Sequence, residues 1–450
     1  MRRSVLIRAP WREPIAILDA YADEPLSLAL LSDGHGARGR WSYLALRPDA
    51  VRVIPAGDPV DPFAVLRDLI GETSPADPQG PPFQGGVAGL LAYELGARVE
   101  GLDLQRHPAW PDAVLARYPS ILAFDHECSE VVAIGNAPDA HQAQVRAKEA
   151  LSWLAGAETQ APAGPLAAAF ESGDGDAYER SVEAIRTRIA AGEIFQANIA
   201  RRWRGRLAPG VRPFDLAARL RQSSPAPFAA YFRLAGLALV SNSPERFLSL
   251  RKEGGGWIAE TRPIKGTAPR GASPAQDAAL AAGLAVSPKD RAENLMIVDL
   301  MRNDLARVCA PGGVKVTDLF AVETFANVHH LVSTVRGTLR AGMGPADLLR
   351  ASFPPGSITG APKVQAMRVI AELEPPRGPF FGAMVWAGFD GALDSSVLIR
   401  TAAFVQDEAG WAFETRAGGG IVADSEPTVE RRETEAKIDA LRRAMMGEAR

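Results

Sequence analysis

One lysine lies in an apolar, strand-like stretch between a proline and a glycine, in the sequence RPIKGT of residues 262–267. A lysine side chain in water is protonated up to a pH of about 10.4, but burial disfavours the charged form and lowers the pKa. The neutral amine then acts as a nucleophile or a base. The segment therefore predicts a reactive amine at Lys265, and a surface or ion-paired lysine is the alternative.

An acid precedes this lysine in the sequence SPERF of residues 243–247. The glycine-rich stretch 252–256 between the two segments is typical of a hairpin loop. A hairpin would place Glu245 and Lys265 on neighbouring strands, where the carboxyl group protonates a leaving group while the amine attacks. A cross-strand salt bridge is the other interpretation.

Further glutamates lie at helical spacing in two later segments. Glu293 shares the apolar face of a predicted helix that starts near residue 288. Glu430, Glu433 and Lys437 share one face of a second predicted helix, which starts near residue 427. Two glutamates from different helices can hold Mg²⁺ together with water and a substrate carboxylate. The pattern predicts a magnesium site, and a solvated helix face is the alternative, above all for Glu430.

Several segments could receive an anion. The sequence GSITGAPK of residues 356–363 precedes a predicted helix, whose free N–H groups suit a negative charge. Residues 417–420, with the sequence AGGG, predict a second turn in which backbone N–H groups approach a ligand. Arg400 lies in an apolar strand pattern, where a carboxylate partner would justify it. His330 is the weakest candidate, because a histidine bonded within the core explains it equally. Together these groups describe a site for a small dianionic acid.

The elements that must position these groups fall into two regions. Residues 1–154 have the pattern of short strands separated by turns, and residues 155–175 have the Ala, Gly and Pro content of a linker. Residues 176–450 mix strands with helices, the pattern of an α+β fold. A chain of 450 residues exceeds one simple core, so either two regions or one large intertwined body is expected.

The second region opens with an expected helix and strand. Asp176 starts a capping-box pattern, and apolar residues follow at helical spacing until Gly192. Residues 194–202 alternate apolar and polar side chains as a strand does. Gln196 and Asn198 would then lie on one face, toward a cleft.

Composition excludes several classes of protein. The formal net charge is -3 and the charges alternate in sign, so no basic face for nucleic acid is expected. Cys128 and Cys309 lie outside any metal or disulfide spacing, and we interpret them as buried free thiols in a reducing compartment. The N-terminus lacks a signal-peptide core, and no apolar stretch reaches the roughly 20 residues of a membrane span. We expect a soluble, cytoplasmic protein without membrane partners.

The ordered motifs from about residue 174 to 441 resemble those of the chorismate-binding enzymes, the family of anthranilate, aminodeoxychorismate, isochorismate and salicylate synthases. Residues 85–94 more weakly resemble the N-terminal part of the members that use amide nitrogen. The motifs are SPERF at 243, RPIKGT at 262, DRAENLMIVDLMRND at 290, HHLVST at 329, GSITGAPK at 356, GGGIVADSEP at 418 and RETEAK at 432. The resemblance implies large antiparallel β-sheets packed together and flanked by helices.

The residue at 265 discriminates between the members that this chain resembles. Anthranilate synthases typically carry alanine at this position. With a lysine there, the chain resembles the members that form aminodeoxychorismate. Isochorismate and salicylate synthases also carry this lysine, as a base that activates water. The long region of residues 1–154 argues against these two, which tend to shorten or lack it. The remaining alternatives are anthranilate synthase, isochorismate synthase and a scaffold without turnover.

The resemblance also implies roles for the candidate residues. Lys265 would add to C2 of the chorismate ring while the C4 hydroxyl leaves with acid assistance from Glu245, and ammonia would then attack C4. Glu293 and Glu433 match the Mg²⁺ ligands. The substrate-binding positions are His330, Thr359, Gly360, Arg400, Gly418, Gly419 and Lys437.

A partner is implied as well, because the chain shows no glutamine-hydrolase pattern around a nucleophilic cysteine. The ammonia would come from a separate glutamine amidotransferase subunit. The chain ends soon after Lys437, so no fused lyase domain is expected. Some family members bind tryptophan through segments similar to residues 30–43 and 227–229, but Asp33 stands where a serine is usual, and tryptophan binding is not expected here.

Overall fold

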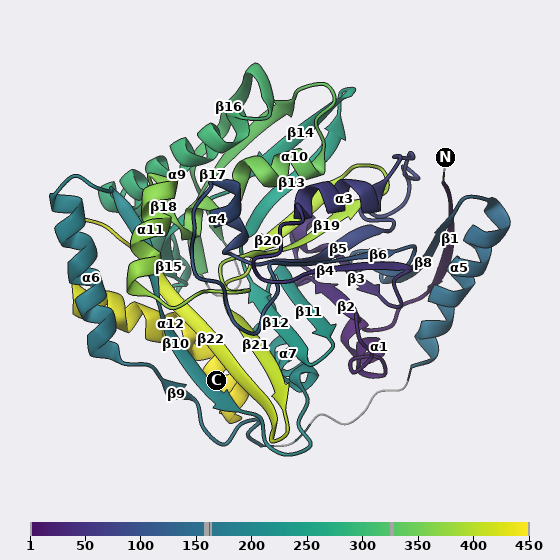
Figure 1. Cartoon of the computed structure of the whole chain (residues 1–450), viewed down its shortest axis with the longest axis horizontal. Helices are drawn as coiled ribbons and strands as arrows, with labels where there is room; N and C mark the ends of the chain where they lie inside the picture. The colour runs from purple at the N-terminus through teal and green to yellow at the C-terminus, as the bar shows by residue number, and fades with distance from the viewer. Residues whose placement is uncertain (1, 157–161, 163, 325–327, 449–450) are drawn as a thin grey trace.

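Two antiparallel β-sheets form the framework of the computed structural model, which describes residues 2–156, 162, 164–324 and 328–448 (Figure 1). Within these residues the larger sheet has twelve strands and the smaller sheet has ten. The larger sheet runs, in spatial order, β1 (Arg3–Pro10), β8 (Glu130–Ala137), β7 (Ser120–Asp125), β3 (Trp41–Ala45), β2 (Leu28–Leu31), β11 (Phe228–Leu234), β12 (Leu237–Ser243), β21 (Thr401–Asp407), β22 (Gly410–Ile421), β10 (Gln196–Arg206) and β18 (Gly360–Ala361), with β9 (Glu171–Ser172) on β10.

The smaller sheet carries the RPIKGT segment at one edge. Its spatial order is β15 (Ile264–Pro269), β17 (Val328–Leu339), β14 (Gly256–Thr261), β13 (Arg246–Glu253), β20 (Leu393–Val397), β19 (Ala383–Gly388), β5 (Gly86–Leu91), β6 (Ala113–Tyr118) and β4 (Ala50–Ile54), with β16 (Cys309–Thr324) on β17. The helices are α1 (Pro14–Asp19), α2 (Gly36–Gly39), α3 (Pro62–Ile70), α4 (Leu95–Val99), α5 (Ala140–Ser152), α6 (Gly175–Ala190), α7 (Pro213–Ser223), α8 (Pro274–Val286), α9 (Pro288–Ala306), α10 (Pro345–Ser352), α11 (Lys363–Leu373) and α12 (Pro427–Met446), with 3₁₀ turns at Trp153–Ala155 and Gly356–Ile358.

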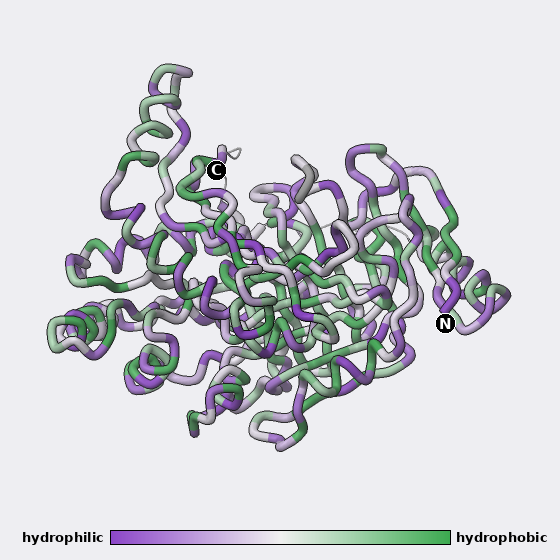
Figure 2. Tube along the Cα trace, turned by 90° about the horizontal axis from the view of Figure 1, so that it is seen from above, coloured by the Kyte–Doolittle hydropathy of each residue, from purple (hydrophilic) through white to green (hydrophobic). Residues whose placement is uncertain are grey.

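Residues of both sheets share one hydrophobic core. Hydrophobic residues are frequent in the interior of the molecule (Figure 2). The main core cluster includes Tyr43, Ile121, Phe232 and Leu239 from the larger sheet and Val87, Leu115, Phe247 and Val385 from the smaller one. A second cluster joins the larger sheet to α7 and α12. This confirms the expected α+β fold of large antiparallel sheets flanked by helices.

Both sheets combine strands from the two sides of the expected linker at residues 155–175. In the larger sheet β2 pairs with β11, and in the smaller sheet β5 pairs with β19. The structure therefore has the intertwined arrangement that was the second expectation for a chain of this length. The division of the chain into two regions, residues 1–154 and 176–450, remains a prediction from the sequence.

Several local predictions agree with the structure, and others need correction. Ser287 caps α9 as expected, but the N-cap of α6 is Asp174, two residues before the predicted Asp176, and its side chain accepts hydrogen bonds from the backbone N–H groups of Asp176 and Ala177. Of the two thiols, Cys309 is buried but Cys128 is exposed. In the described residues no helix is both long and apolar enough to cross a membrane.

A buried ion pair ties α9 to the start of α11. Lys363 Nζ lies 2.7 Å from Asp304 Oδ2 and donates a second hydrogen bond, at 2.9 Å, to the carbonyl of Ser352. Burial raises the pKa of Asp304 to about 6, and the Lys363 ammonium opposes that rise. The pair holds the helix that carries Glu293 against the loop that carries Thr359.

Removing one partner of this pair is expected to destabilise the fold strongly. Asp304→Ala leaves a buried ammonium without its carboxylate, and the free energy of unfolding should fall by about 3–5 kcal/mol. Urea unfolding followed by circular dichroism measures the loss. The double variant Asp304→Leu/Lys363→Met should be far closer to the wild type, because it leaves no lone charge. A single variant as stable as the wild type would contradict this account.

Candidate active site

Lys265 lies on the edge strand β15, where the pairing with β17 is irregular. Lys265 is opposite Leu331, the register then shifts, and Thr267 is opposite His330. The skipped residue is Gly266, whose φ of +79° favours glycine, and an added Cβ there would lie 2.9 Å from the Asp290 side chain. The bulge thus sets the direction of the strand beside Lys265.

The surroundings of the Lys265 amine favour its neutral form. Loss of water on burial lowers the pKa of Lys265, the carboxylates of Glu293 and Glu245 oppose that change, and Lys437 adds to it. The structure therefore places a desolvated amine among acids, as the sequence indicated. Its role as a nucleophile remains a prediction.

Glu245 lies immediately before β13 and is buried. The predicted hairpin exists, since β13 pairs with β14 across the loop at residues 254–255. The expectation that Glu245 and Lys265 occupy neighbouring strands is wrong, because β14 and β17 lie between β13 and β15. The two groups still interact: burial raises the pKa of Glu245, and Ser357 and then Lys265 oppose the rise.

Ser357 holds the Glu245 carboxyl group, which the sequence did not reveal. The Ser357 hydroxyl donates a hydrogen bond of 2.6 Å to Glu245 Oε1, and both residues are buried. From its sequence alone, the motif at 356–363 predicts an anion receptor and gives no indication of this contact. A hydroxyl beside a buried acid fixes its direction and favours its charged form.

Ser357→Ala is therefore expected to lower kcat by about tenfold and to shift the alkaline limb of the pH profile upward, because Glu245 loses a bond that favours its ionised form. Ser357→Thr should restore much of the wild-type profile. The pH dependence of kcat measures both changes. An unchanged profile in the alanine variant would show that the bond has no influence on Glu245.

Three glutamates from α9 and α12 share one electrostatic environment. Burial raises the pKa of Glu293, and Glu430 adds to that rise, while Glu433 adds to a similar rise at Glu430. Glu430 accepts a 2.7 Å hydrogen bond from the Ser425 hydroxyl, and Glu433 lies 2.6 Å from the Lys437 ammonium. In the described part of the chain Glu293 makes no ion pair or hydrogen bond.

These carboxylates fit a magnesium ion. Among the described residues, no group of three or more His, Cys, Asp or Glu gathers closely enough to enclose a metal. Mg²⁺ does not need such a cage, because it keeps several waters and binds through one or two carboxylates. Burial and, to a lesser extent, neighbouring carboxylates raise the pKa values of Glu293 and Glu430, and a cation bound between them would favour their charged forms. Glu293 and Glu433 remain the predicted ligands.

Arg400 lies in the connection between β20 and β21, so its predicted place inside a strand is wrong. Its φ is +52°, which a short connection imposes and which strand pairing excludes. Burial lowers the pKa of Arg400, and Glu433 opposes that change. Within the described chain its guanidinium makes no ion pair, so it is available for a carboxylate from outside the protein.

The three glycines of residues 418–420 lie within β22 and not in a turn, which corrects the sequence prediction. They pair with β10 from Ala200 to Asn198. An added Cβ at Gly418 would lie 1.9 Å from the carbonyl oxygen of Ile199, and one at Gly419 would lie 2.9 Å from Glu430 Oε2. Glycine is needed here for close packing of backbone and acids, and Lys437 Nζ donates to the Gly418 carbonyl at 2.8 Å.

His330 and the 356–363 loop complete the predicted set. His330 Nδ1 lies 3.0 Å from the Thr267 hydroxyl, and burial lowers the pKa of His330, with Arg400 adding to that effect. Thr359 is fully buried and donates to the Pro355 carbonyl at 2.8 Å. Gly360 has a φ of +140°, and its added Cβ would lie 2.2 Å from the Gln196 carbonyl oxygen.

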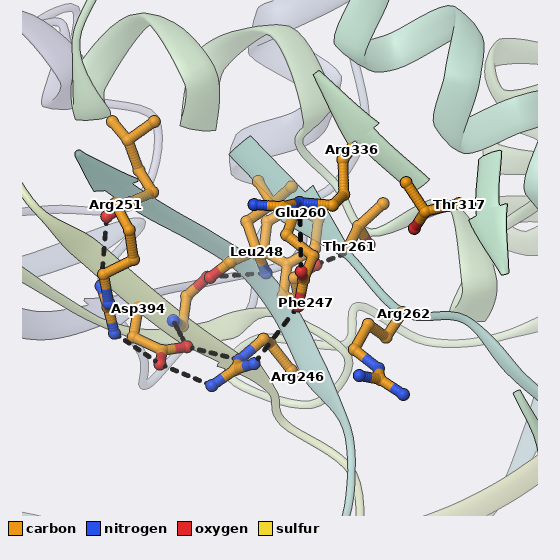
Figure 3. A network of polar contacts seen from close by, with 12 residues as sticks. Arg246, Phe247, Leu248, Arg251, Glu260, Thr261, Arg262, Thr317, Arg336 and Asp394 are labelled. Atoms are coloured by element: carbon orange, nitrogen blue, oxygen red, sulfur yellow. Dashed lines mark hydrogen bonds and ion pairs between the residues drawn. The ribbon is translucent and has the colours of Figure 1, made fainter. Parts of the chain in front are cut away.

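The segments that hold tryptophan in some family members line one cavity of about 320 Å³ between the sheets. Ionic groups already lie along its wall. Asp394 accepts two 3.0 Å hydrogen bonds from Arg246 and one of 3.1 Å from Arg251, as Figure 3 shows. Arg251 lies over the Trp386 ring. The expectation that tryptophan does not bind stays a prediction.

Comparisons with known proteins agree with this architecture. A family model described as chorismate binding enzyme matches residues 31–443. The chain is 39% identical to aminodeoxychorismate synthase component 1 of Klebsiella aerogenes, over 98% of this chain and 99% of the relative. It is 42% identical to the protein of the same name in Salmonella typhimurium, over 85% of this chain and 82% of the relative. Anthranilate synthase component I from Streptococcus pneumoniae has a similar structure, with a TM-score of 0.78, 28% identity, and coverage of 90% of this chain and 93% of the other.

Proposed function

Because this chain belongs to the family of chorismate binding enzymes, we propose that it aminates chorismate to 4-amino-4-deoxychorismate, which leads to 4-aminobenzoate and folate. The observation that carries the proposal is the desolvated amine of Lys265 beside Glu245, since anthranilate synthases typically have alanine at this position. Two relatives named aminodeoxychorismate synthase component 1 match most of the chain and support the same reaction.

The proposed chemistry has two displacements. The neutral amine of Lys265 forms a bond to C2 of the ring, the two conjugated ring double bonds shift toward C4, and the C4 oxygen leaves as water after taking a proton from Glu245. Ammonia then forms a bond to C4, the two double bonds shift back, and the C2–N bond breaks with its electron pair returning to Lys265. The new ammonium group loses a proton to the Glu245 carboxylate, which restores the acid. Covalent attachment divides one difficult substitution into two easier ones.

The two carboxylates of chorismate need cationic or N–H partners. Arg400 offers a guanidinium without an ion pair in the described structure, and Lys437 lies beside the Gly418–Gly419 backbone. Thr359, Gly360 and His330 are proposed to complete the substrate site. A bound Mg²⁺, held by Glu293 and Glu433, would neutralise the ring carboxylate so that it can lie among acids.

Ammonia is proposed to come from a glutamine amidotransferase subunit. The word component in the names of the relatives supports a partner of this kind. Free ammonia should replace the partner in vitro, because the attack on C4 of the ring needs only a neutral ammonia molecule.

Product identification tests the proposal. Purified protein is incubated with chorismate, Mg²⁺ and ammonium chloride at mildly alkaline pH, and a lyase specific for aminodeoxychorismate is then added. Formation of 4-aminobenzoate is expected. Anthranilate would move the assignment to anthranilate synthase, isochorismate would show that Lys265 activates water instead, and binding without any product would indicate a scaffold.

A further inference from the structure

A cavity of about 770 Å³, which we call the Arg202 pocket, lies against the larger sheet. One side of it is a single face of the neighbouring strands β21, β22 and β10 (Figure 1), because side chains two positions apart on a strand point the same way. The residues on this face are Arg202, Arg204 and Arg206 of β10, Ala412, Glu414 and Arg416 of β22, and Ala403 and Val405 of β21. Its described lining contains none of the residues proposed to bind chorismate or Mg²⁺.

Aromatic and apolar side chains form another part of the lining. Trp110 and Phe380 line the pocket and are buried, and both belong, with Ala403, to the core cluster that the two sheets share. Pro375 and Pro376 add further apolar surface. Cavities of roughly 300–1,000 Å³ with apolar walls and a few polar groups are typical of small-molecule sites. The Arg202 pocket therefore has the size and the walls of a site for a ligand with a ring system.

Three guanidinium groups share one carboxylate in this pocket. Glu414 Oε1 accepts a 2.7 Å hydrogen bond from Arg416, and Glu414 Oε2 accepts one of 3.0 Å from Arg204. Arg202 Nη1 lies 3.9 Å from Glu414 Oε2, and its guanidinium makes no hydrogen bond in the described part of the chain. Burial lowers the pKa of Arg202, and Glu414 opposes that change. A second carboxylate would therefore find an arginine that is partly desolvated and not yet hydrogen-bonded.

The other charged groups of the lining compensate one another or are neutral. Arg206 pairs with Asp407 through hydrogen bonds of 2.7 and 2.8 Å. Glu171 lies opposite Arg204 where β9 pairs with β10. Burial lowers the pKa of His107, which favours the uncharged ring at neutral pH. One guanidinium is therefore in excess, and a ligand with a single negative charge would balance it.

We propose that the Arg202 pocket binds an aromatic monocarboxylate, whose carboxylate pairs with Arg202 and whose rings contact Trp110 and Phe380. A carboxylate forms two parallel hydrogen bonds with a guanidinium, and aromatic rings pack favourably against one another. The volume of about 770 Å³ has room for two fused or linked rings. Chorismate has two carboxylates and no aromatic ring, so it matches this pocket poorly. The inference does not depend on the proposed amination.

Calorimetric titration of the full chain with 2-naphthoate tests the proposal, with 2-naphthamide as the neutral ligand of the same shape. The wild type should bind 2-naphthoate at least about tenfold more tightly than 2-naphthamide. Arg202→Met keeps an apolar side chain of similar length and removes the charge, so it should weaken 2-naphthoate binding about tenfold and leave 2-naphthamide binding within about twofold. Arg180→Met is the matched control, because this arginine of α6 is 71% exposed and lies outside the pocket lining. It should match the wild type.

Two further variants locate the bound ligand. Ala169 is exposed and lines the pocket, so Ala169→Trp fills the space without disturbing the core and should weaken the binding of both ligands about tenfold. Arg400→Met removes a cation of the proposed chorismate site and should leave 2-naphthoate binding unchanged. If the wild type does not bind 2-naphthoate, or if Arg202→Met and Ala169→Trp bind it as the wild type does, the inference is wrong. Loss of binding in Arg400→Met would place the ligand in the proposed chorismate site and would also overturn it.

Discussion

Lys265→Ala should lower the rate of chorismate amination by about 10⁴-fold, because the variant lacks the amine that forms the covalent adduct. The effect should appear in kcat. The affinity for chorismate should change little, since Arg400 and the glycines of β22 are intact in this variant. The measurement is 4-aminobenzoate formation in a coupled assay, together with chorismate binding by calorimetry. Lys265→Arg is the matched control for charge, because arginine stays protonated and does not attack.

Lys265→Arg is expected to be as inactive as the alanine variant, which separates nucleophilic attack from charge alone. The wild-type rate should also rise with pH as Lys265 loses its proton. Because burial lowers the pKa of Lys265, this rise should occur below the pH of about 10.4 at which an ordinary lysine is half neutral. Full glutamine-dependent or ammonia-dependent activity in Lys265→Ala would rule out the covalent route.

Glu245→Gln should lower kcat by about 10³-fold, because glutamine cannot donate a proton to the departing C4 oxygen. In the wild type the acid form of Glu245 is required, so activity should fall as pH rises through its pKa, which burial raises. The variant should lack this alkaline limb. The pH dependence of kcat for both proteins is the measurement.

Glu253→Gln provides a matched control on the same strand. Glu253 is at the exposed end of β13, where it pairs with Arg336 far from the Ser357 contact. Its replacement should leave the rate and the pH profile unchanged. A Glu245→Gln variant with the wild-type alkaline limb would assign acid catalysis to another group.

Local patterns predicted much of the framework. The cap at Ser287, the helix with Glu430, Glu433 and Lys437, and the hairpin between β13 and β14 depend on neighbours within a few residues, and all three are present. The motifs identified the correct family, and the resemblance to that family predicted the large antiparallel sheets. Prediction succeeds here because caps, turns and helical spacing are local.

The errors concern contacts between distant segments. Lys265 and Glu245 were expected on adjacent strands because they are close in sequence, but β17, which follows more than sixty residues later, inserts between β14 and β15. The glycines at 418–420 appeared to form a turn, whereas pairing with β10 extends them. No local pattern indicates which distant strand will pair.

The contacts of Ser357 and Asp304 show the same limit. The sequence displayed a small-residue loop and a lysine after it, yet it gave no sign that the hydroxyl would meet Glu245 or that Lys363 would find its carboxylate on α9. Such pairs join residues 59 or 112 positions apart. Only the packing of the two sheets and α9 brings them together.

Because the two halves of the chain share both sheets, they should stay associated after the chain is cleaved between them. A single cut near residue 160 would yield two fragments that remain joined by the ladders β2–β11 and β5–β19 and by the core between the sheets. Neither fragment would hold a complete sheet by itself. Coexpressed as separate polypeptides, the halves should therefore reassemble into an active pair, whereas the C-terminal half alone should aggregate through its unpaired β11 and β19 edges.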